Sequence, residues 1–117
     1  MAEILIREQL GNWKTQIRKG YLELCILLVI QKNERLYGFD LLERLRDMDL
    51  DLREGTVYPL LNRMTADGVL QAVWDTENVK GHPRKFYSLT KEGARFVDGM
   101  KTEFGKMIDI YSSVKKK

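Results

Sequence analysis

The segment from Arg53 to Thr90 constrains the fold most, because its pattern changes from helical to strand-like spacing within one short stretch. Apolar residues first recur at the spacing of one face of a helix, namely at Val57, Leu60, Leu61 and Met64. The outward face of that helix would carry Thr56, Tyr58, Pro59, Asn62 and Arg63, with no carboxylate from residue 55 to residue 66. Gly68 then predicts the end of the helix, as a glycine just past the last periodic residue commonly does.

Two strand candidates follow this helix. Residues 70–75 are rich in apolar and aromatic side chains, and residues 84–90 alternate, with Lys85, Tyr87 and Leu89 on one face. The polar tip between them, residues 76–83, contains Lys80 and His82. A helix followed by a hairpin with a cationic tip is typical of a winged helix-turn-helix, in which the helix enters the DNA major groove and the tip reaches the backbone or minor groove.

Five short motifs occur in order along most of the chain: residues 20–27 (Gly-Tyr-Leu-Glu-Leu-Cys-Ile-Leu), Leu36-Tyr37-Gly38, residues 54–64, Gly68-Val69-Leu70 and residues 84–93. Together they closely resemble the PadR family of bacterial transcriptional regulators, in its compact subclass with a single C-terminal helix. The resemblance implies a DNA-binding homodimer. The family motif carries the same Tyr58-Pro59 pair, so we expect Pro59 to loosen the first turn of the helix, with regular helix after it.

The length and composition of the chain indicate a single domain. It has 117 residues, 44% of them hydrophobic, and a net charge of +3. Cations gather at Lys14, Arg18 and Lys19, at Lys80, Arg84 and Lys85, and at residues 115–117, whereas residues 40–54 carry six carboxylates against three arginines and should face away from DNA. The lone Cys25 indicates a reduced cytoplasmic protein. The apolar run 25–30 is too short for a membrane span, and early charges argue against a signal peptide.

The remaining segments read as helices around this centre. Residues 3–14 form a short amphipathic helix whose stripe, Ile6, Leu10, Trp13 and Ile17, is spaced as in a coiled coil. Residues 20–33 are apolar almost all round and should lie at the centre of the core. A third helix is expected at residues 37–47, and residues 49–52 alternate and are expected to form a short strand that pairs with the hairpin.

The C-terminal segment, residues 91–114, carries a heptad seam at Gly93, Val97, Met100, Phe104, Met107, Tyr111 and Val114, and Thr90 is placed to cap the helix. The small body has too little apolar surface to bury so long a helix. We therefore predict a twofold homodimer in which the C-terminal helix of one chain packs on the N-terminal helix of the other. The predicted organisation is a dimer helix (1–17), a winged helix-turn-helix domain (18–90), and a dimerisation helix with a basic tail (91–117).

Each candidate DNA contact has an assigned role. Thr56, Asn62 and Pro59 would face base edges, since an asparagine amide can pair with adenine. The phosphate contacts would be Tyr37, Tyr58, Arg63, Lys85 and the backbone at Gly38, with His82 and Arg84 along the hairpin. An ordinary solvated surface residue is the alternative for each residue taken singly. The predicted partner is an operator in double-stranded DNA.

A second candidate site is a pocket for an aromatic effector at the dimer interface. It comprises Leu10, Trp13, Ile17, Val97, Met100, Phe104, Met107, Ile108 and Tyr111. The alternative is that these residues form only the hydrophobic core of the dimer interface and bind no ligand, because aromatic residues and methionines at heptad spacing often serve packing alone. Three functions stay open: an effector-controlled repressor, a DNA-binding regulator without an effector, and a winged helix that binds only protein. We expect no enzyme, cofactor or metal, since neither a Gly-rich phosphate loop nor a metal-spaced ligand set occurs.

Overall fold

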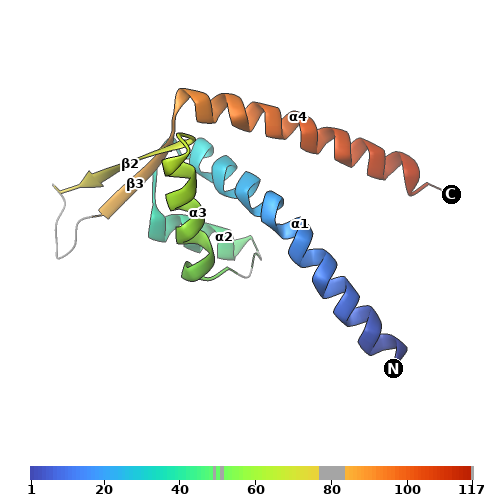
Figure 1. Ribbon diagram of the computed structural model, residues 1–117. Coiled ribbons are helices and arrows are strands. Elements are labelled where there is room, and N and C mark those ends of the chain that lie inside the picture. The colour runs from blue at the N-terminus through green and yellow to red at the C-terminus, as the bar shows by residue number, and fades with distance from the viewer. Residues whose placement is uncertain (49, 51, 77–83, 117) are drawn as a thin grey trace.

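The computed structural model describes residues 1–48, 50, 52–76 and 84–116. Its elements are, in chain order, α1 (Ala2–Lys32), β1 (Leu36–Tyr37), α2 (Gly38–Asp47), α3 (Glu54–Ala66), β2 (Leu70–Asp75), β3 (Arg84–Leu89) and α4 (Lys91–Val114). The three strands form an antiparallel sheet in the order β1-β3-β2. The winged helix-turn-helix body lies at one end, and α1 and α4 leave it as two diverging arms (Figure 1).

The N-terminal region differs from the prediction of two helices, because residues 2–32 form the single helix α1. Its C-terminal half is anchored by core residues, of which Ile26, Leu27 and Ile30 are completely buried. Once a helix is anchored, each further residue adds one hydrogen bond, and a glycine costs only about 1 kcal/mol relative to alanine. Gly11 and Gly20 therefore do not break α1.

The recognition helix α3 has the predicted inner face, with Val57, Leu61 and Met64 buried. The predicted loosening at Pro59 is wrong, because α3 is helical from Glu54 onward. The missing proline N–H affects only the carbonyl of Gly55, which lies in the exposed first turn, where water can solvate it.

Gly68 ends α3 as predicted. Its φ is +81°, and the N–H groups of Gly68 and Val69 donate to the carbonyls of Thr65 and Met64 at 3.2 and 2.9 Å. This is the Schellman pattern, which needs a left-handed residue just past the helix.

The sheet contains a strand in a place that the sequence reading missed. The expected strand at residues 49–52 is not found: Leu50 and Leu52 lie outside any strand, and residues 49 and 51 lie outside the described residues. The third strand is instead β1, where Leu36 pairs with Tyr87, and both side chains are buried. Burial of this pair holds β1 in the core.

Helix α4 begins as predicted, at a cap made by Thr90. The hydroxyl of Thr90 accepts a hydrogen bond from the Gly93 N–H at 2.9 Å and donates to the carbonyl of Gly68 at 2.6 Å. The end of α3 and the start of α4 are thus tied together by one side chain. No helix in the described part of the chain combines the length and apolar character needed to cross a membrane.

We predict that Gly93→Ala destabilises the fold by about 1–3 kcal/mol, because a Cβ at this position would overlap the backbone carbonyl oxygen of Val69. Gly99→Ala, in the same helix but with open space around its Cβ position, should instead stabilise by roughly 0.5–1 kcal/mol. Urea unfolding of both variants at one protein concentration measures the difference. Equal stability of the two variants would contradict the tight junction.

Candidate nucleic-acid interface

The outward face of α3 carries most of the residues predicted to contact DNA. Thr56, Pro59, Asn62 and Arg63 are all exposed, and the absence of carboxylates from residue 55 to residue 66 means that α3 itself adds no negative charge to this face. Such a face can approach the phosphate-lined major groove without electrostatic repulsion. Glu54 and Asp67, the nearest carboxylates in the sequence, lie at the two ends of the helix.

Tyr58 departs from the expected outward position and is half-buried against α2. A Cβ at Gly38 would lie 2.8 Å from the ring carbon Cε1 of Tyr58, so the glycine leaves room for this ring. Burial, and next to it the charge of Glu54, raises the pKa of Tyr58. A tyrosine hydroxyl is protonated at neutral pH even without this shift, so Tyr58 can donate a hydrogen bond.

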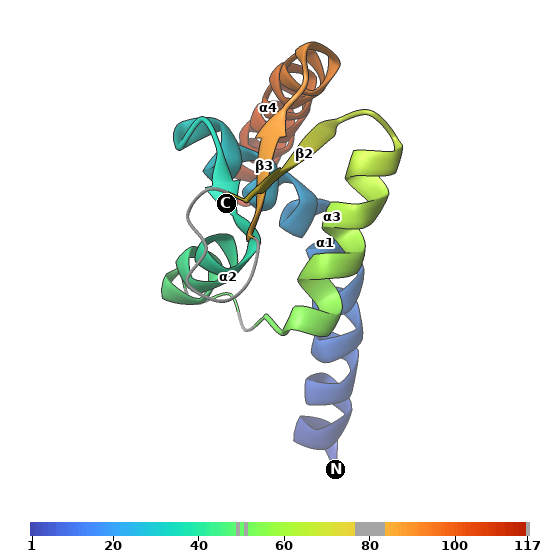
Figure 2. The ribbon, with the colours of Figure 1, turned by 90° about the vertical axis from the view of Figure 1, so that its left-hand side faces the viewer.

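Half of the sequence-predicted DNA contacts line one cleft, which we call the wing cleft. It has a volume of about 530 Å³, and its lining comes from the start of α2, from α3 and from the hairpin of β2 and β3. Figure 2 shows how these elements are arranged. Its lining includes Tyr37, Gly38, Tyr58, Arg84 and Lys85. The lining also contains the carboxylate of Asp40. Its two cations and several aromatic rings are nevertheless the kinds of group that bind a nucleic-acid backbone and stack on its bases or sugars.

Trp74 also lines the wing cleft, although it is not among the predicted DNA contacts. Trp74 is 59% exposed, and the Lys85 ammonium lies 5.6 Å from the centre of its ring. The strand register places Trp74 directly opposite Lys85. The predicted hairpin could have identified Trp74 as a cleft residue, because pairing of the two strands places it beside the predicted contact Lys85.

Tyr37 is held by contacts on the outer face of the sheet. Its ring stacks on Phe86 at 3.8 Å between centroids, and its hydroxyl donates to the Asp75 carboxylate at 2.8 Å. That hydrogen bond, more than burial, raises the pKa of Tyr37. The Arg84 guanidinium lies 5.1 Å from the same ring, so Tyr37 positions one of the cleft cations.

Arg63 and His82 complete the set of predicted contacts. Arg63 forms an ion pair with Glu23 of α1, which the sequence reading did not anticipate because the two residues are far apart in the chain. His82, predicted to lie along the hairpin, is outside the described residues.

The predicted effector residues gather mainly in an apolar groove between α1 and α4, with a volume of about 600 Å³. Its lining includes Ile17, Met100, Phe104, Met107, Ile108 and Tyr111, and Tyr21 stacks on Phe104 at 5.9 Å. Leu10 and Trp13 lie on α1 outside this lining, and both are more than half exposed. Val97 is not part of the groove, since it is completely buried in the core of the chain itself.

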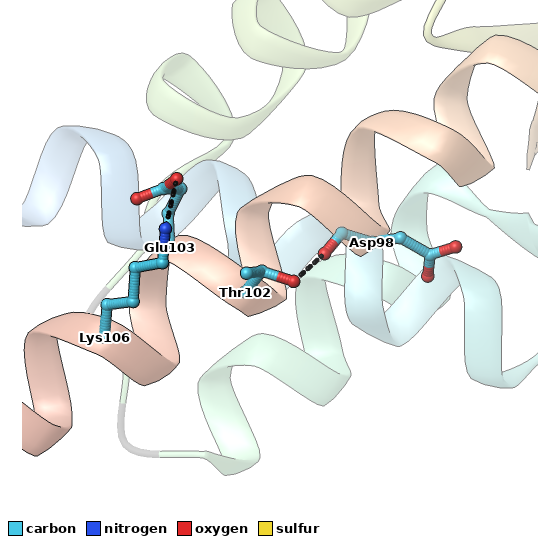
Figure 3. Close-up of polar contacts among 4 residues, drawn as sticks. All are labelled: Asp98, Thr102, Glu103 and Lys106. Carbon is cyan, nitrogen blue, oxygen red and sulfur yellow. Dashed lines mark hydrogen bonds and ion pairs between the residues drawn. The ribbon is translucent and has the colours of Figure 1, made fainter.

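Away from the apolar groove, α4 carries polar residues that make contacts within their own helix, and one of these contacts is with Glu103 of the groove lining. Thr102 donates to the carbonyl of Asp98 at 3.1 Å, and the Lys106 ammonium lies 3.5 Å from the Glu103 carboxylate (Figure 3). Exposed pairs of this kind contribute little to stability. Helix α4 therefore has one apolar face suited to an interface and one face suited to solvent.

Groups that could support catalysis do not come together in the described residues. No cluster of three potential metal ligands occurs there. Cys25 is buried, and burial raises the pKa of its thiol, which disfavours the nucleophilic thiolate.

Comparison with known proteins identifies the family of this arrangement. The model of the "Transcriptional regulator PadR-like family" matches residues 26–98, from the core half of α1 into α4. A PadR-like transcription factor from Bacteroides fragilis is 37% identical, with a TM-score of 0.75 over 88% of this chain and 98% of that one. A PadR family regulator from Eggerthella lenta is 25% identical, with a TM-score of 0.82 over 97% and 99%. A PadR-like regulator from Bacillus cereus is 29% identical, with a TM-score of 0.75 over 87% and 99%.

A search of curated proteins found no match. The family match nevertheless spans more than half of the chain, and the similar solved structures extend over nearly their whole lengths. These findings confirm the winged helix-turn-helix fold and a regulatory, non-enzymatic function. The chain belongs to the PadR-like family of transcriptional regulators, and it is a DNA-binding regulator.

Proposed function

We propose that this regulator is a homodimeric repressor that binds a pseudo-palindromic operator in the cytoplasm, where bacterial DNA lies. The observation that carries the proposal is the wing cleft beside the carboxylate-free face of α3. Asn62 and Thr56 would contact base edges, while Tyr37, Tyr58, Arg84 and Lys85 would contact the backbone. Bound at an operator, such a protein would block access of the transcription machinery to it.

The two arms of the molecule support the dimer. The apolar stripe of α1 continues from the apolar groove to Leu10 and Ile6, and that of α4 continues to Tyr111 and Val114, all of them exposed. The arms diverge in Figure 1, and these four residues are each more than half exposed, which leaves apolar surface open to a partner chain. A second copy related by a twofold axis would cover both stripes and place the recognition helices roughly 34–36 Å apart, one turn of DNA.

The apolar groove supports control by an aromatic compound. Its volume of about 600 Å³ falls within the range of small-molecule sites, roughly 300–1,000 Å³. Its lining is mostly aliphatic and aromatic, with the half-buried Phe104 as a ring on which a flat molecule can stack. If a helix of the partner chain fills the same groove, no space is left for a ligand. The second candidate function is therefore a DNA-binding regulator without an effector.

Selection of bound DNA from a random pool tests the operator proposal, and we expect a palindromic sequence. Asn62→Ala should then weaken binding to the selected site by about 1–3 kcal/mol and relax its sequence preference, because one base contact is lost. Thr102→Ala, on the polar face of α4, serves as the control and should bind as the wild type does. Selection of no sequence, or an Asn62→Ala variant with full specificity, would refute this assignment.

Analytical ultracentrifugation tests the dimer. The wild type should sediment with about twice the chain mass of 13.7 kDa. Met107→Glu places a carboxylate in the apolar stripe and should give the monomer mass, because burying an unpaired charge is costly. Thr102→Glu adds the same charge on the opposite face of α4 and should stay dimeric. A monomeric wild type at micromolar concentrations would contradict the proposal.

Tryptophan fluorescence tests the effector. The chain has two tryptophans, so a Trp74→Phe variant reports on Trp13 alone. A panel of planar aromatic compounds should include one that quenches Trp13 and, with the wild-type protein, lowers affinity for the selected DNA. Phe104→Ala should weaken that quenching. A panel without any such compound would favour the regulator that has no effector.

A further inference from the structure

A second groove lies between α1 and α3, and its lining is cationic. We call it the basic groove; its volume is about 600 Å³. Helix α1 contributes residues at helical spacing along one of its faces, and α3 contributes residues of its exposed face. The polar and charged side chains of the lining are Thr15, Arg18, Lys19, Glu23, Thr56 and Arg63.

The charges of this groove favour an anion. Three cations line it against one carboxylate, that of Glu23. Glu23 is already paired with Arg63, whereas Arg18 and Lys19 are exposed and form no ion pair among the described residues. Two cations that line a concave surface attract a negatively charged ligand.

The position of the groove on α3 identifies that ligand. Residues of a helix advance by about 100° each, which places Asn62 between Tyr58 on one side and Arg63 on the other. Tyr58 lines the wing cleft and Arg63 lines the basic groove. A helix that reads base edges in the major groove has a sugar-phosphate backbone on each side. The wing cleft and the basic groove therefore flank Asn62 in the way the two backbones flank the major groove, while Thr56, the other proposed base contact, belongs to the lining of the basic groove.

We propose that the basic groove binds the phosphodiester backbone of the DNA strand on the α1 side of the recognition helix. Arg18 and Lys19 contact phosphates, and Arg63 exchanges Glu23 for a phosphate when DNA arrives. Helix α1 thereby becomes a DNA-contacting element in addition to α3 and the hairpin. This inference rests on the proposed DNA-binding function of the α3 face.

The salt dependence of DNA binding tests the proposal, because each phosphate contact contributes about 0.9 to the slope of log affinity against log salt. The probe is a fluorescein-labelled duplex of mixed sequence, titrated by fluorescence anisotropy over a series of potassium chloride concentrations. The R18Q/K19Q variant should lose up to about 1.8 from the slope. The control K101Q/K106Q removes the same charge from α4 and should keep the wild-type slope; circular dichroism checks that both variants are folded.

Glu23→Gln gives an independent result of opposite sign. Removal of the only carboxylate in the groove lining should tighten DNA binding at every salt concentration, because a phosphate no longer competes with Glu23 for Arg63. Unchanged or weaker binding would overturn the proposal, as would an R18Q/K19Q slope equal to that of the control. A wild type that binds no DNA at low salt would overturn the proposed function itself, so the two failures are distinguishable.

Discussion

The burial of the C-terminal half of α1 is the interaction on which the rest of the structure depends. Ile26, Leu27 and Ile30 are completely buried, and each such side chain contributes roughly 1.5–3 kcal/mol. Residues of α2, α3 and the sheet pack against these three side chains in one hydrophobic core. Because α1 is one continuous helix, fixing this half also fixes the direction of the exposed half. The outer stripe of α1 is therefore held in a defined orientation before any partner arrives.

The wing cleft follows from strand alternation. Leu70, Ala72 and Tyr87 face the core from one side of the sheet, and the same side continues outward to Trp74 and Lys85. The strands extend beyond the hydrophobic core, so Trp74 and Lys85 line the wing cleft instead of packing in the core. The opposite side carries Tyr37 and Phe86, whose stacking gives the edge strand β1 a second support. A two-residue strand is short, and these ring contacts help to explain why it pairs at all.

Elements with strong local signals could be predicted from the sequence, whereas contacts between distant segments could not. Helix α3, both hairpin strands and the Thr90 cap follow from periodicity and from residues a few positions apart. The break expected before Gly20 is absent because tertiary anchoring outweighs the local cost of glycine. The strand at residues 36–37 was missed because its partner lies fifty residues away.

The candidate site divides in the same way. The exposure of Thr56, Asn62 and Arg63 follows from helical spacing, and the structure confirms it. The contact of Tyr58 with Gly38 and the pair of Arg63 with Glu23 depend on how separate elements pack, which no local pattern encodes. The continuity of α1 had the largest consequence, since it brings the cations at residues 18 and 19 beside α3.

Helix α1 also contributes residues to the lining of both grooves. Ile17, Tyr21 and Leu24 line the apolar groove against α4, while Arg18, Lys19 and Leu22 line the basic groove against α3. Adjacent residues thus face different neighbours, and a close-packed helix moves as a rigid body. A molecule that moves the exposed half of α1 relative to the rest of the domain would therefore also move Arg18 and Lys19 relative to α3. A change of one or two ångströms is sufficient to alter a phosphate contact. Under the proposed function, a molecule in the apolar groove would thus change DNA affinity without unfolding any part of the domain.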